Sequence, residues 1–185
     1  MEKLVRGVAL IAFGAFVVGA GYGLVQQMVK MSTLQSLNNN DISVEQALLV
    51  AQGAMDACKK KDNSVISVAV VDRNGLVRFL LRGDGASNEM ADNARRKAYT
   101  ARTFRQNVST WMERTAIDAK DDKGKPIDLN GQQYLENTIA EAGGVPIIRY
   151  ADGIGGVGVT GAKGGPMADE ACAQAGADAI ADQLL

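Results

Sequence analysis

The sequence predicts an α+β domain: an antiparallel sheet of two hairpins covered by helices. Two apolar, β-branched stretches, at 65–81 and 145–160, are each interrupted by a turn signal, which is typical of a hairpin. Segments with apolar residues at helical spacing precede, separate and follow these stretches. The predicted order of elements is therefore α-β-β-α-α-β-β-α, with a hydrophobic N-terminal helix before it.

Composition excludes several classes of function. The chain has 185 residues, enough for one domain with a sizeable core. Its 20 basic and 21 acidic residues are nearly balanced, which argues against a nucleic-acid binder. It contains no histidine, so the commonest metal ligand, the commonest general base and any Ser-His or Cys-His pair are missing. Its two cysteines are too few for a zinc cage.

Residues 1–30 have the pattern of a signal peptide or of an N-terminal membrane anchor. Lys3 and Arg6 precede an uncharged run at 7–29, which at about 1.5 Å per residue can just cross a bilayer core of about 30 Å. Its most apolar part, 8–18, has the length of a signal-peptide core. Cleavage and retention both stay open. In either case the basic residues place the domain outside the cytoplasm, as a periplasmic or other extracytoplasmic protein.

Residues 31–41 are polar and are interpreted as a linker, so the folded domain is expected at 42–185. Ser43 is a good N-terminal cap for the first helix. The first hairpin pairs 65–71 with 76–81, because Asn74-Gly75 is a strong hairpin signal. The apolar face predicted for the first helix consists of Val44, Ala47, Leu48, Ala51, Ala54, Met55 and Cys58.

The next helix is predicted from Ser87 to about Gln106, with alanines along its apolar stripe. It also carries a run of basic side chains. Such a run is ordinarily a solvated face, and the alternative is a rim that binds anions. The basic residues are Arg95, Arg96, Lys97, Arg102 and Arg105.

A capping-box pattern of Thr110 and Glu113 predicts a short helix, followed by a loop at 118–132 and another short helix at 133–141. The second hairpin turns at 151–153, and the last helix is expected at 167–185. The glycines of its return strand indicate that a helix or a ligand approaches the backbone closely. They also spell a dinucleotide fingerprint, but inside a strand, where no helix opens after it.

Cys58 and Cys172 fall on the apolar faces of the first and last helices. An exported location permits a disulfide between them, which would require Cα atoms within about 7 Å. The sequence does not fix this distance, and buried free thiols are the favoured expectation.

Several short stretches, in this order, resemble the GlcG/HbpS family of haem-binding and glycolate-operon-associated proteins. The resemblance spans 42–185 and implies a profilin-like fold that assembles into oligomers, with haem binding in some members. The stretches are Val68-Ala69-Val70-Val71-Asp72, Asn74-Gly75, Arg82 with Asp84-Gly85-Ala86, Lys97-Ala98-Tyr99-Thr100-Ala101, Gly143-Gly144-Val145-Pro146-Ile147, Gly156-Val157-Gly158-Val159-Thr160-Gly161, and Asp169-Glu170 with Ala175-Gly176.

A haem site in this chain would have to work without a histidine ligand. The resemblance places Tyr99 and Thr100 as candidate ligand residues, with Lys97 and Arg82 as partners of the propionates. For each residue a purely structural role is the alternative. Separately, Glu89 and Asp92 lie one helical turn apart and could hold a hard metal cation, or simply belong to a solvated face.

The expected function is a non-enzymatic, exported or membrane-anchored module with haem as its candidate ligand. It would form a homo-oligomer or an accessory subunit of a membrane-associated complex. The alternative is an enzyme of small-acid, glycolate-like metabolism that uses acid–base groups. The groups available for such chemistry are Asp72, Asp84, Asp152, Asp169 and Lys97.

Overall fold

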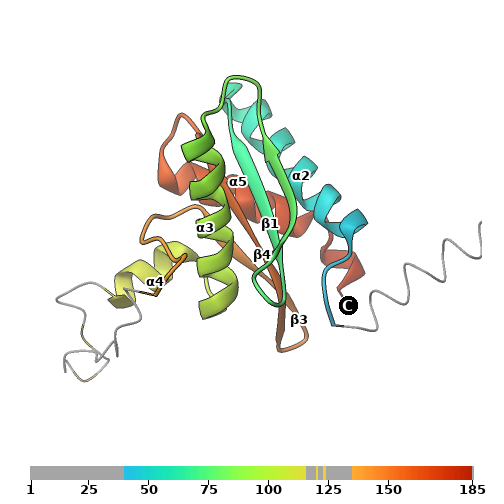
Figure 1. Cartoon of the computed structure of the whole chain (residues 1–185), viewed down its shortest axis with the longest axis vertical. Coiled ribbons are helices and arrows are strands. Elements are labelled where there is room, and N and C mark those ends of the chain that lie inside the picture. The colour runs from blue at the N-terminus through green and yellow to red at the C-terminus, as the bar shows by residue number, and fades with distance from the viewer. Residues whose placement is uncertain (1–39, 116–119, 121–122, 124–134, 185) are drawn as a thin grey trace, which may run out of the picture. The chain divides into compact units, whose positions relative to one another are not determined.

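The computed structural model describes residues 40–115, 120, 123 and 135–184, and Asn40–Leu185 form one compact unit (Figure 1). The predicted hydrophobic segment at 7–29 and most of the predicted loop at 118–132 lie outside the described residues. Among the residues described, no helix combines the length and the apolar character needed to cross a membrane. The elements are α2 (Val44–Asp62), β1 (Ser67–Asp72), β2 (Val77–Arg82), α3 (Asn88–Phe104), α4 (Val108–Thr115), β3 (Gly144–Arg149), β4 (Asp152–Thr160), α5 (Pro166–Asp178) and a 3-10 turn η2 (Ala181–Gln183).

The four strands form one antiparallel sheet in the order β2-β1-β4-β3. Each predicted hairpin supplies two neighbouring strands, and the hairpins meet where β1 pairs with β4, for example at Val70 and Val157. The predicted fold class is therefore confirmed: an antiparallel sheet of two hairpins covered by helices.

The helices cover the two faces of this sheet differently (Figure 1). Successive strand residues point to opposite faces. Val68 and Val70 of β1 belong to a large apolar cluster with α2 and α5, whereas Ala69 and Val71 pack against α3. The sheet thus has an α2/α5 face and an α3 face.

Helix α2 begins as predicted, because Ser43 and Gln46 cap it reciprocally. Its buried stripe differs from the predicted one: Val44 and Leu48 are 54% and 48% exposed, and Val50 is fully buried. The stripe passes through residues 47, 50, 51, 54 and 58, so residues 44 and 48 lie at its edge.

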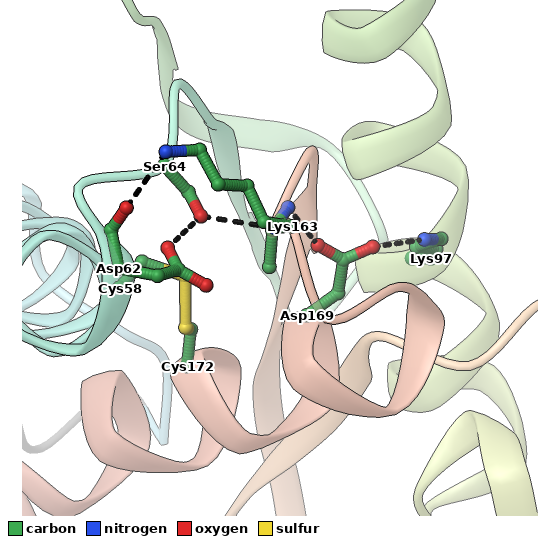
Figure 2. Close-up of a disulfide and its surroundings, with 8 residues drawn as sticks. Cys58, Asp62, Ser64, Lys97, Lys163, Asp169 and Cys172 are labelled. Atoms are coloured by element: carbon green, nitrogen blue, oxygen red, sulfur yellow. Dashed lines mark hydrogen bonds and ion pairs between the residues drawn. A yellow bond between two sulfur atoms is a disulfide. The ribbon is translucent and has the colours of Figure 1, made fainter.

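The expectation of free thiols was wrong, because Cys58 and Cys172 form a disulfide (Figure 2). Glycines on both helices let α2 and α5 pack closely: a Cβ added at Gly176 would lie 2.5 Å from the Val50 carbonyl oxygen. The two cysteine Cα atoms are consequently 5.6 Å apart, within bonding range.

Two local predictions between the hairpins need correction. Helix α4 begins at Val108, so Thr110 lies within it and does not cap it. The amide of Ser109 instead donates to the carboxylate of Glu170 on α5, a cap from a distant part of the chain. The described part of the helix expected at 133–141 contains turns and bends and no helix.

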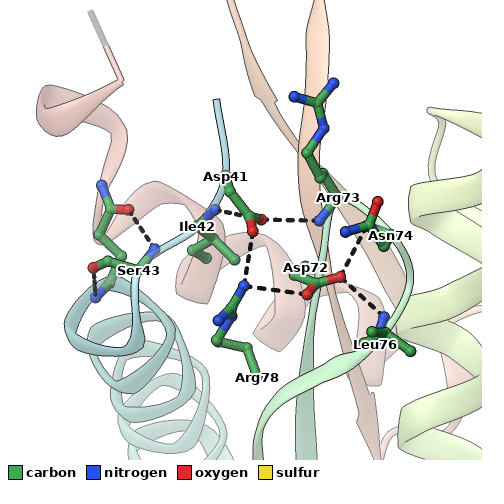
Figure 3. A network of polar contacts seen from close by, with 9 residues as sticks. Asp41, Ile42, Ser43, Asp72, Arg73, Asn74, Leu76 and Arg78 are labelled. Atoms are coloured by element: carbon green, nitrogen blue, oxygen red, sulfur yellow. Dashed lines mark hydrogen bonds and ion pairs between the residues drawn. The ribbon is translucent and has the colours of Figure 1, made fainter. Parts of the chain in front are cut away.

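Both hairpin turns lie at the same end of the domain as the start of α2 (bottom of Figure 1). We call this the turn end and define it by Asn40, Asp41, the turn at 73–76 and the turn at 150–151. Asp41 accepts hydrogen bonds from the amide of Arg73 and the guanidinium of Arg78, at 3.0 and 2.7 Å (Figure 3). Asn40 donates to Asp152 at the second hairpin, so the entry of the chain is fixed to both hairpins.

Candidate functional site on the α3 face

The α3 face brings helix and sheet backbones into direct contact. Ser87 caps α3 through the Met90 amide, as predicted, and the alanine stripe faces the glycines of β4. A Cβ added at Gly158 would lie 2.1 Å from the Ala94 carbonyl oxygen. The glycines of the second hairpin therefore admit a helix of the same chain.

Lys97 is neither a solvated charge nor an open rim residue, because its side chain is 0% exposed. Its Nζ lies 3.0 Å from Oδ2 of Asp169, which is itself buried at the start of α5 (Figure 2). The same Nζ lies 3.6 Å from a carboxylate oxygen of Glu141. The other oxygen of Asp169 accepts the Ala162 amide at 2.7 Å. This buried pair joins α3, α5 and the end of β4.

Burial raises the pKa of Asp169 above its ordinary value, since removing a carboxylate from water disfavours its charged form. The Ala162 amide and the charge of Lys97 act in the opposite direction without cancelling the effect. Keeping the Asp169 carboxylate charged inside the folded domain therefore costs free energy.

Thr100 is buried and its hydroxyl is occupied by backbone groups. It donates to the Arg96 carbonyl at 2.8 Å and accepts the Ile139 amide at 2.9 Å. Arg96 reaches the same segment through the Thr138 carbonyl, at 2.6 Å. Thr100 therefore fastens 138–139 onto α3.

Tyr99 and Arg82 both lie on the α3 side of the sheet, away from Lys97 and Thr100. The ring of Tyr99 covers the first turn, since a Cβ added at Gly75 would lie 2.6 Å from it. Arg82 pairs across the ladder with Ser67, at the other end of β2, and donates to the Ala86 carbonyl at 2.6 Å. The length of β2, about 17 Å at the usual rise per residue, separates the two positions.

Between these positions, β2 exposes apolar side chains. Leu80 and Val77 pair with Ala69 and Val71, which face α3, so they point to the same side. They are 45% and 46% exposed. We call Val77, Leu80 and Arg82 the β2 strip.

The carboxylates of Glu89 and Asp92 are both exposed on α3. Asp92 is held by Arg95, with a nitrogen–oxygen distance of 2.9 Å. Throughout the described part of the chain, no group of three or more potential metal-ligating His, Cys, Asp or Glu side chains occurs.

The other acid–base groups of the enzyme alternative do not converge. Asp72 accepts the Asn74 and Leu76 amides of its turn, Asp152 binds Asn40, and Asp84 is exposed in the loop after β2. Only Asp169 and Lys97 meet, and both are enclosed by the fold.

One buried acid had no role assigned from the sequence. Glu170 accepts the amides of Ser109 and Gly143, each at 3.1 Å, and also the Ser109 hydroxyl. It thereby ties α4 and the start of β3 to α5. Two adjacent acids within an alanine-rich helix were the available sequence signal, because charged residues are seldom buried unless they are paired.

This fold and the α3 face define a class of small α+β modules in which a helix lies directly on a glycine-rich hairpin. The model of the HbpS-like family, described as "Haem degrading protein HbpS-like", matches residues 42–178. The chain belongs to this family. A comparison with curated proteins finds no match.

Solved structures support the same assignment. A double mutant of HbpS from Streptomyces reticuli is 34% identical, with a TM-score of 0.65, and the match covers 76% of this chain and 87% of that one. Klebsiella pneumoniae ORFY is 27% identical, with a TM-score of 0.62, covering 75% and 90%. A PduOC:haem complex, at 20% identity and a TM-score of 0.60 over 76% and 96%, shares the fold.

Proposed function

We propose that this protein is a non-enzymatic haem-binding module held outside the cytoplasm. The observation that carries the proposal is the family match over residues 42–178, together with 34% identity to a protein named HbpS. The family description refers to haem, and the more distant PduOC was solved as a haem complex.

The β2 strip suits haem better than the interior of the α3 face does. Lys97 and Thr100 are engaged inside the domain, whereas Arg82 and the exposed leucine and valine lie at the surface. An apolar macrocycle can cover Val77 and Leu80, and a guanidinium can pair with a propionate. Tyr99, beside the strip, offers a phenol oxygen, a known haem ligand.

Titration of the full chain with haemin, followed by the Soret band, tests this proposal. Leu80→Asp removes apolar contact in the strip and should weaken binding about tenfold, since burying part of a leucine contributes on the order of 1–1.5 kcal/mol. Met167→Asp is the matched control, because Met167 is 63% exposed at the start of α5, which packs on the opposite face of the sheet. Absence of a Soret band, or equal weakening by both variants, would reject the site.

The disulfide supports an extracytoplasmic location, because such bonds persist in oxidising compartments. We propose that residues 7–29 export the domain or anchor it to the membrane. Intact mass of the protein from cells shows whether the segment is retained, and thiol alkylation without reductant shows whether both cysteines are bonded in vivo. Free thiols in freshly prepared protein would oppose this location.

The proposal includes assembly, either as a homo-oligomer or as an accessory subunit of a membrane-associated complex. Exposed apolar residues on α2 support it: Val44, Leu48 and Leu49 are 54%, 48% and 42% exposed. Sedimentation of the full chain gives the oligomeric state, and Leu49→Lys should reduce it. A monomer at all concentrations would leave only the accessory role.

We also propose that the carboxylates of Glu89 and Asp92 bind a hard cation weakly at the surface. The cation would have to displace Arg95 from Asp92, so binding should be weak and salt-sensitive. Calorimetry with a hard divalent cation tests it, and Glu89→Gln should abolish the signal. A heat of binding unchanged in Glu89→Gln would exclude this pair.

A further inference from the structure

The turn end carries large apolar residues where turns ordinarily have small or polar ones. Leu76 in the first turn is 66% exposed, and Tyr150 in the second is 78% exposed. Turn positions of this kind usually take glycine, asparagine or aspartate. Both side chains therefore project from the tips of the sheet without an apolar contact that would hide them from water.

Tyr150 is retained there despite its backbone conformation. Its φ is +56°, in the left-handed region, where a side chain costs roughly 1–2 kcal/mol. Glycine or asparagine would relieve much of this strain, and the tyrosine supplies little packing in return. Strain kept at an exposed aromatic residue points to a role at the surface.

The turn end carries a small excess of positive charge. The guanidinium of Arg149 lies 5.3 Å from the centre of the Tyr150 ring, and Arg105 packs over Gly153 beside the same turn. Arg73 occupies the other turn. Asp41 and Asp72 share one cation, Arg78, and Asp152 accepts a hydrogen bond from the neutral amide of Asn40, so four arginines stand against three aspartates.

The chain also enters the domain at this end. Hydrogen bonds fix Asn40 and Asp41 to the two hairpins, and the uncharged run at 7–29 lies shortly before them in the sequence. The linker at 31–41 can extend by no more than about 3.5 Å per residue, roughly 35–40 Å in all. A membrane that held residues 7–29 would thus lie within reach of the tips.

We propose that the turn end is a membrane-contacting surface specific for anionic lipid. Leu76 and Tyr150 enter the boundary between headgroups and acyl chains, where tyrosine is favoured. Arg73 and Arg105 pair with lipid phosphates. This inference rests on the proposed retention of residues 7–29 and is independent of haem binding.

The test places a tryptophan reporter at each end of the full chain. Tyr150→Trp labels the turn end, and Met167→Trp is the matched control, because Met167 is 63% exposed at the N-terminal end of α5, opposite the turns. The native Trp111 is 2% exposed and supplies the baseline. Each variant is reconstituted in phosphatidylcholine–phosphatidylglycerol vesicles whose acyl chains are brominated near the headgroup.

We expect bromine to quench the added fluorescence at position 150 at least about twofold more than at position 167. The difference should shrink when phosphatidylglycerol is omitted, because the arginines lose their partners. Flotation of the vesicles reports the anchor separately. A chain that floats but shows equal quenching at both positions overturns the contact and leaves the anchor, and a chain that does not float overturns both.

Discussion

The two faces of the sheet are packed against their helices by different kinds of contact. The α2/α5 face is closed by a large cluster of aliphatic side chains and by the Cys58–Cys172 disulfide. The α3 face has a small alanine–valine cluster, direct backbone contact at Gly158 and the buried Lys97–Asp169 pair.

The difference shows where tolerance and specificity lie in this domain. Hydrophobic burial is non-directional, so the α2/α5 face can exchange one aliphatic residue for another of similar volume at modest cost. On the α3 face, each backbone contact leaves no space, and each buried polar atom requires its own partner. Lys97 and Thr100, which the resemblance places at a haem site, hold elements of the fold together there.

Removal of the disulfide should give the largest effect. The cysteines are 114 residues apart, and the chain-entropy model gives a stabilisation of about 4–5 kcal/mol for such a loop. Cys58→Ala with Cys172→Ala should lower the free energy of unfolding in urea by about this amount. Reductant should act slowly on the native protein, since both cysteines are buried.

A double variant within about 1 kcal/mol of the parent would mean that aliphatic packing alone holds α2 to α5. The disulfide would then not be one of the features that distinguish the stability of the α2/α5 face from that of the α3 face.

Loss of the buried cation should come next. Lys97→Met leaves Asp169 with only the Ala162 amide and should destabilise by about 3–4 kcal/mol, as for other broken buried pairs. Adding Asp169→Asn keeps an acceptor for that amide and should restore about half of the loss. Lys60→Met, at an exposed lysine of α2, is the control and should stay within about 0.5 kcal/mol.

If Lys97→Met unfolds at the same urea concentration as the parent, the pair contributes nothing. The α3 face would then be an ordinary apolar contact.

A methyl group in strand β4 tests the backbone contact. Gly158→Ala would bring a carbon 2.1 Å from the Ala94 carbonyl, so α3 must shift, at a cost of about 2–3 kcal/mol. Gly153→Ala lies in the same strand with its nearest neighbour at 3.5 Å and should be nearly neutral. Equal thermal midpoints for the two variants would show that α3 has room to move.

The sequence predicted the fold well because its strongest signals are local. Asn74-Gly75 and the glycines of β4 determine their hairpins within a few residues, and the two β-rich segments can form a sheet only by pairing. The helix expected at 133–141 was wrong for the opposite reason: its described part is held by long-range hydrogen bonds to Thr100 and Arg96 of α3.

The burial of the candidate site residues could not be predicted, because burial is a property of the whole fold. Lys97 stands beside Arg95 and Arg96 in one basic run, and only a carboxylate 72 residues away distinguishes it. The roles of Glu170 and of the disulfide likewise depend on how α5 meets α2, α3 and α4. Arg82 was expected just after the strand that ends at residue 81, and it is the last residue of β2.

The pH dependence of stability should show the smallest effect. It tests whether the fold as a whole disfavours or favours the charged form of Asp169. The pKa of Asp169 is raised in the folded domain, so between the ordinary value of 3.8 and the raised value the folded state binds more protons than the unfolded state. This group therefore favours folding as the pH falls through that window.

Asp169→Asn lacks the titration, so the stability of the parent relative to Asp169→Asn should rise on acidification and level off below about pH 4. Urea unfolding of both proteins in pH steps measures the difference, and titrations common to both cancel. A relative stability that falls on acidification would mean that the attraction to Lys97 outweighs the desolvation of Asp169. The ionised Lys97–Asp169 pair would then stabilise the packing of the α3 face.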